Sequence, residues 1–200
     1  MAVERIVLLP GDPWREAAKR AGAVLRAGGV ALLPTEGVYG LHVVASDPAA
    51  VERLQQIKPR DGKTGFIGVI AEPQDVARWA ETGPRADALV ERHWPGALTL
   101  VLKALPGAPP SMRSADGTIA LRCPGNPFLR AAVQHATGIV ISTSANEPGK
   151  PPMVLPEGFP GEVADLIVDQ GTLSGIASTI VSVQGERITV LRRGAVSIAT

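Results

Sequence analysis

The chain's 200 residues, 45% of them hydrophobic, suit one domain with a sizeable core, and we expect a single domain over residues 1–200. Its 20 basic and 19 acidic residues nearly cancel, which argues against a protein that coats nucleic acid through bulk charge. The single cysteine, Cys123, excludes an internal disulfide and fits the reducing cytoplasm, and the lack of a visible secretory signal or bilayer-length apolar run argues against a membrane partner.

The first half of the chain alternates short apolar runs with segments of helical periodicity. The apolar runs predict strands at residues 6–9, 30–33 and 65–70. Helices are predicted from Asp12-Pro13 to Gly28 and from Asp47-Pro48 to Ile57, because each begins with a capping residue followed by proline. Between them, residues 34–40 are rich in turn formers.

The second half contains more strands. Helices are predicted near Pro73, near Pro84, and from Asn126-Pro127 to about His135. Strands are predicted at residues 98–102, 118–122, 138–141, 163–168, 178–183 and 187–191. Two long loops rich in proline and glycine, residues 105–117 and 147–161, are of a length that is often functional. The early alternation and the late strands predict an α/β fold with a mixed sheet.

A basic loop follows the second helix. The stretch Lys58-Pro59-Arg60-Asp61-Gly62-Lys63-Thr64 holds three cations, which suit phosphate or carboxylate, although a solvated surface loop is the alternative. Its end resembles a phosphate-binding P-loop, but Ile57 stands where the first glycine is needed and a helix precedes it. We therefore exclude a P-loop.

Small polar side chains follow a predicted strand at Ser142-Thr143-Ser144-Ala145-Asn146. In open α/β sheets ligands usually bind at the carboxyl ends of strands, so this cluster is a candidate nucleotide site, with a turn or helix cap as the alternative. Arg122 and Arg192 each end a late strand, where arginine either pairs with carboxylate or phosphate or is solvated. The histidines lack metal-ligand spacing, so we expect no tightly bound, protein-ligated metal.

Seven segments together resemble one known family. They are residues 34–40, Lys58-Pro59-Arg60, Trp94-Pro95-Gly96-Ala97-Leu98-Thr99, Ala120-Leu121-Arg122, residues 142–146, Ser178-Thr179-Ile180-Val181 and Leu191-Arg192-Arg193-Gly194. Their order and spacing resemble the threonylcarbamoyl-AMP synthase family, in its short form with one YrdC-type domain. The resemblance implies a twisted open mixed sheet with flanking helices and a concave ligand-binding face.

The family condenses L-threonine, bicarbonate and ATP, with Mg²⁺ expected on the nucleotide, to threonylcarbamoyl-AMP and pyrophosphate. The product serves tRNA threonylcarbamoyladenosine modification, which makes RNA or tRNA contact and partner proteins of that pathway expected partners. By position, the resemblance gives Lys58 and Arg60 a catalytic role at the ATP phosphates. It assigns the nucleotide to Lys58, Arg60, Lys63, Thr118, Ser142, Ser144, Asn146 and Arg192, and threonine to Thr35, Arg122 and Ser178.

Some positions depart from the family pattern. Pro148 replaces a serine and so removes a hydroxyl and a backbone donor, and His42-Val43 replaces a pair of small residues. These departures keep two alternatives open. One is a divergent paralogue that binds structured RNA without synthase activity, and the other is a nucleotide-binding protein that takes a different acid.

Overall fold

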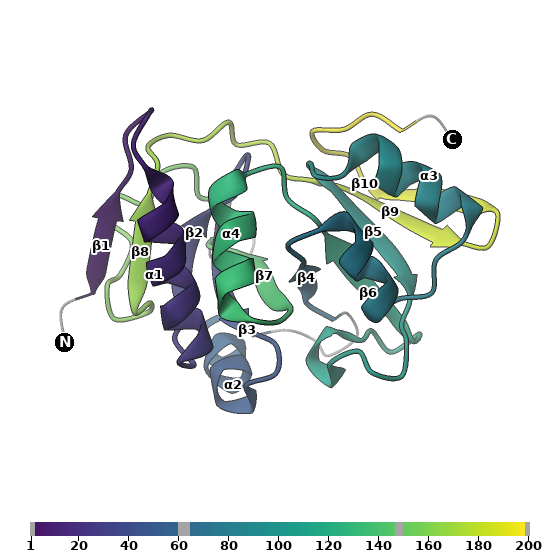
Figure 1. Ribbon diagram of the computed structural model, residues 1–200, viewed down its shortest axis with the longest axis horizontal. Coiled ribbons are helices and arrows are strands. Elements are labelled where there is room, and N and C mark those ends of the chain that lie inside the picture. The colour runs from purple at the N-terminus through teal and green to yellow at the C-terminus, as the bar shows by residue number, and fades with distance from the viewer. Residues whose placement is uncertain (1–2, 60–64, 147–149, 199–200) are drawn as a thin grey trace.

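The computed structural model describes residues 3–59, 65–146 and 150–198, and these contain ten strands in one sheet (Figure 1). The strand order is β1-β8-β2-β3-β7-β4-β6-β5-β9-β10, with parallel and antiparallel neighbours. The strands are β1 (Glu4–Val7), β2 (Ala31–Pro34), β3 (Tyr39–Val44), β4 (Ile67–Val69), β5 (Leu98–Lys103), β6 (Thr118–Arg122), β7 (Val140–Ser144), β8 (Leu166–Asp169), β9 (Thr179–Gln184) and β10 (Arg187–Arg192). The prediction of a mixed sheet with flanking helices is confirmed.

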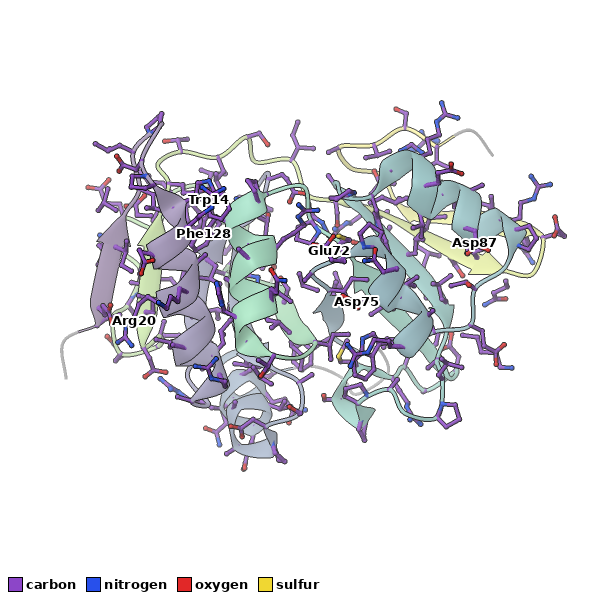
Figure 2. The ribbon with its side chains drawn as sticks, in the orientation of Figure 1. Trp14, Arg20, Glu72, Asp75, Asp87 and Phe128 are labelled. Atoms are coloured by element: carbon purple, nitrogen blue, oxygen red, sulfur yellow. The ribbon has the colours of Figure 1, made fainter. Side chains whose placement is uncertain are left out.

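Helices cover both faces of this sheet. They are α1 (Trp14–Arg26), α2 (Pro48–Ile57), α3 (Pro84–His93) and α4 (Pro127–Ala136), with 3₁₀ helices η1 (Pro73–Arg78) and η2 (Pro110–Met112). Figure 1 shows α1 and α4 side by side across one half of the sheet, and Trp14 and Phe128 lie at the same end of this pair (Figure 2). Leu33 and Val140 share the apolar cluster of α1 and α4, whereas Leu41 and Leu121 belong to a second cluster on the opposite face with α2, η1 and α3.

The face packed by α1 and α4 stays partly open over the middle of the sheet. The register pairs Ser142 with Ile67, Ile67 with Ala120, and Ala120 with Val101, and paired residues point to the same face. Ile180 pairs with Thr99 on the next strand and shares this face. These five residues, Ser142, Ile67, Ala120, Val101 and Ile180, are half-buried, and we call them the open strip.

Most helices and strands lie near their predicted positions, but strand β3 and the short 3₁₀ helix η2 were not predicted. Asp47 and Asn126 cap α2 and α4 through their side chains, as predicted. Asp12 does not cap α1, because its carboxylate accepts the Leu9 N–H instead. Residues 34–40 were interpreted as a turn-rich segment, but strand β3 begins at Tyr39, so this interpretation was wrong for the last two residues. The helix predicted near Pro73 is a single 3₁₀ segment.

Close packing of α1 on α4 depends on Gly22. A methyl group at this position meets Cβ of His135 at 2.3 Å and the Ala132 carbonyl oxygen at 2.8 Å, so the helices have to separate. We expect Gly22→Ala to lower the free energy of unfolding by about 1–3 kcal/mol, as measured by urea denaturation. Gly107→Ala is the control, because no atom lies within 4 Å of its added methyl. Equal stability of the two variants would contradict this packing.

Candidate functional site

A small cavity opens between the turn that follows β2 and the strands of the open strip. It has a volume of about 30 Å³, and Arg122, Thr35, Ser178 and Ser142 lie in its wall with Thr99. Its apolar lining is Ile67, Val69, Pro124 and Leu129. The three residues expected to hold threonine therefore come together from β6 and from two loops that are far apart in the sequence.

Arg122 is fixed by partners on two sides. Its side chain forms an ion pair with Glu36, and its Nε donates to the Gly96 carbonyl oxygen at 3.2 Å. Glu36 also accepts the Gly125 backbone N–H, so one carboxylate ties the arginine to the following turn. With a relative exposure of only 8%, Arg122 is a buried cation, and Glu36 neutralises part of its charge. Its guanidinium has further N–H donors that can bind an anion.

Arg192 is hydrogen-bonded to Ser178, which lines the small cavity. Its Nη2 donates to the Ser178 carbonyl oxygen at 2.8 Å and to the Ser178 hydroxyl at 3.1 Å. Burial lowers the pKa of Arg192, and the Arg122 charge lowers it further, so the two cations share one electrostatic environment. Gly194 allows this arrangement, because an added methyl there meets the Ala177 carbonyl oxygen at 2.3 Å.

The hydroxyl of Thr35 is engaged within its own turn. It donates to the Val38 carbonyl oxygen at 2.8 Å and accepts the Val38 N–H at 3.3 Å. A hydroxyl has one hydrogen and two lone pairs, so Thr35 keeps one lone pair for a ligand. It can accept a hydrogen from an ammonium or hydroxyl group, but it has no hydrogen left to donate.

A larger cavity of about 620 Å³ borders Lys58 and Asn146. Lys58 follows the last residue of α2, and its Nζ donates to the backbone carbonyl of Asn146 beyond β7. The Asn146 amide donates to the Lys150 carbonyl oxygen at 2.7 Å. Much of the remaining wall is apolar and comes from Leu41, Ile57, Met153, Val154, Leu155, Phe159, Pro160 and Val163.

The other predicted nucleotide residues are placed differently. Ser144 is exposed at the end of β7, two residues beyond Ser142 on the same face. Thr118 starts β6 and donates its hydroxyl hydrogen to Asp116 at 2.6 Å, and it borders a third cavity beside Lys103. Arg60 and Lys63, together with Pro148, lie outside the described residues.

His42 faces the same side of the sheet as Ser142, its register partner on β7, but has no exposed surface. Its Nδ1 lies 2.9 Å from the Gly40 carbonyl oxygen; since that oxygen only accepts, Nδ1 carries the hydrogen. Burial lowers the pKa of His42 to about 4, so the ring is neutral near pH 7. His42 is therefore a core residue at this position, and it supplies no charge to the cavity.

The described part of the chain offers neither a metal site of protein side chains nor a membrane-spanning helix. Across residues 3–59, 65–146 and 150–198, no group of three His, Cys, Asp or Glu side chains has the arrangement to hold a metal ion. Over the same part of the chain, every helix is too short or too polar to cross a bilayer.

The matching family model and the related sequences agree on one family. The family model Sua5/YciO/YrdC, described as telomere recombination, matches residues 23–194. A threonylcarbamoyl-AMP synthase of Alkalilimnicola ehrlichii is 36% identical over 134 residues, which are 67% of this chain and 70% of that relative. One of Bacillus subtilis is 33% identical over 187 residues, which are 89% of this chain but only 53% of the longer relative.

Solved structures agree with the sequence relatives. The Pyrococcus abyssi Sua5 structure with L-threonine superimposes with a TM-score of 0.85 at 28% identity, over 97% of this chain and 58% of that one. Escherichia coli YciO superimposes with a TM-score of 0.87 over 96% of both chains. Because the two sequences are only 24% identical, this similarity shows a shared fold and nothing further. With the family model covering most of its length, this chain belongs to the Sua5/YciO/YrdC family.

Proposed function

We propose that this protein is an enzyme, a nucleotidyltransferase that forms threonylcarbamoyl-AMP and pyrophosphate from L-threonine, bicarbonate and ATP. The observation that carries the proposal is the small cavity that combines Arg122, Thr35, Ser178 and Ser142. A partly neutralised buried arginine suits a carboxylate, and the free lone pair of Thr35 suits an amino group. The relatives named as threonylcarbamoyl-AMP synthases support this assignment.

We infer that the nucleotide lies over the open strip, beside the small cavity, because Ser142 and Ser144 of β7 and Thr118 of β6 share that face. Lys58, which follows α2 and donates to the Asn146 carbonyl beyond β7, supplies a cation for the phosphates. Ser142 and Arg192 lie toward the amino-acid cavity, so the α-phosphate belongs near them. Arg60, Lys63, Ser144, Asn146 and Thr118 remain proposed nucleotide contacts from the family resemblance.

The reaction needs positioning and charge stabilisation more than acid–base groups. The threonine nitrogen bonds to the bicarbonate carbon with loss of water, and an oxygen of the resulting carbamate attacks the α-phosphorus of ATP. The bond from the α-phosphorus to the bridging oxygen breaks, and pyrophosphate leaves with that oxygen. Fixed cations such as Lys58 and Arg192 oppose the charge that builds on phosphorus, and Mg²⁺ enters with the ATP phosphates.

The test is pyrophosphate release by the purified protein with ATP, Mg²⁺ and bicarbonate, with each amino acid supplied in turn. We expect release with L-threonine that depends on bicarbonate, and a product with the mass of threonylcarbamoyl-AMP. No release with threonine, together with tight, salt-sensitive binding of structured RNA, would instead assign the chain to the non-catalytic paralogue. Release with another acid alone would replace threonine as the substrate.

Cys123 is expected to take no part in this chemistry. It is fully buried beside the Ala71 carbonyl oxygen, and burial raises the pKa of its thiol to about 11. The sulfur is therefore protonated and unreactive near pH 7. We expect Cys123→Ser to keep pyrophosphate release within about three-fold, because an oxygen replaces sulfur at an unreactive position. Complete loss of turnover in a variant with normal thermal stability would show that the thiol is needed.

A further inference from the structure

A hydrogen-bonded pair of hydroxyls lies in the wall of the small cavity. Thr99 Oγ1 and Ser178 Oγ are 2.9 Å apart, and both residues are buried. The two are 79 positions apart in the sequence and meet because β5 runs parallel to β9. Thr99 is fully buried, and the family resemblance gives it no role.

Only one of the two hydroxyls donates the hydrogen of the bond between Thr99 and Ser178, so the other hydroxyl keeps its hydrogen. Arg192 only donates, so its 3.1 Å contact uses a lone pair of the Ser178 oxygen. That bond polarises the Ser178 hydroxyl and makes it the better donor toward Thr99. The hydrogen of Thr99 is then available to a group in the cavity, which both residues line.

We propose that Thr99 is a specificity-determining residue that donates a hydrogen bond to the side-chain hydroxyl of the amino-acid substrate. This inference rests on the proposed function and extends it from the carboxylate and amino group to the side chain. The cavity also presents Val69 and Leu129, whose apolar surfaces suit the substrate's methyl group.

The wild-type protein supplies the first test. Valine has the shape of threonine without the hydroxyl, and allo-threonine exchanges the positions of the hydroxyl and methyl groups. We expect kcat/KM for pyrophosphate release to favour threonine over valine by at least about a thousand-fold, because a buried donor is unpaired with valine. We expect at least about ten-fold discrimination against allo-threonine. Equal values for threonine and valine would overturn the proposal with no variant involved.

The second test replaces Thr99 by valine, which keeps its shape and removes its hydroxyl. We expect kcat/KM for threonine to fall about ten- to a hundred-fold and that for valine to rise, because the variant has no Thr99 hydroxyl to leave unpaired, while KM for ATP stays within about two-fold. Thr99→Ser keeps the hydroxyl and is the matched control, expected to retain the preference for threonine. An unchanged threonine-to-valine ratio in Thr99→Val would refute the role of Thr99 and leave the synthase assignment intact. Absence of wild-type turnover would reject the synthase assignment itself.

Discussion

Replacing Arg122 by lysine is expected to raise KM for threonine by about ten- to a hundred-fold and to leave KM for ATP within about two-fold. Lysine keeps the positive charge but lacks the planar fork that donates to Glu36, to the Gly96 carbonyl and to a carboxylate at the same time. The retained charge keeps Glu36 from being left unpaired, so the fold is expected to survive. Steady-state pyrophosphate release with each substrate varied in turn measures both constants.

Two controls isolate the geometry of Arg122. Arg85→Lys makes the same exchange at an exposed ion pair with Glu186, where we expect no change in either constant. Glu36→Gln removes the charge that orients Arg122 and is expected to raise KM for threonine by a smaller factor. If Arg122→Lys raised KM for ATP as much as KM for threonine, the arginine would belong to the nucleotide site instead.

Local sequence signals predicted most of the strands and helices that surround the candidate site. Residues 118–122 form a strand as predicted, because an apolar run follows a loop rich in glycine and proline. Asp47-Pro48 and Asn126-Pro127 begin helices because capping depends on neighbouring residues alone. Strand β3 was not predicted because Tyr39-Gly40 and His42 do not show a clear alternation of apolar and polar residues. Its conformation is decided by its pairing with β2 and β7.

The site itself depends on contacts that no local signal contains. Glu36 and Arg122 are 86 positions apart, and neither residue's neighbours predict that they pair. Thr99 ends the Trp-Pro-Gly-Ala-Leu-Thr segment, so the family pattern marked it, but its partner Ser178 follows only from the parallel pairing of β5 with β9. The family resemblance proposes Thr35, Arg122 and Ser178 as threonine-binding residues. The structure adds which hydrogen-bond donors and acceptors of these side chains are left for a ligand.

The largest effect on turnover is expected at Lys58. Its Nζ lies at the edge of the large cavity and bridges the end of α2 to the Asn146 carbonyl. A charge-assisted hydrogen bond contributes about 1.5–3 kcal/mol, and a contact of that size made in the transition state lowers kcat by about ten- to a hundred-fold or more when lost. We therefore expect Lys58→Ala to reduce pyrophosphate release by at least that factor at saturating threonine.

Lys19→Ala is the matched control for Lys58→Ala. Lys19 is also a lysine, but it is exposed on α1 and lines neither cavity of the candidate site. Exposed substitutions of this kind have little effect, so its turnover is expected to equal that of the wild type. Thermal melts of both variants separate lost chemistry from lost folding. If Lys58→Ala raised KM for ATP and left kcat unchanged, Lys58 would bind ground state and transition state equally, and its catalytic role would be rejected.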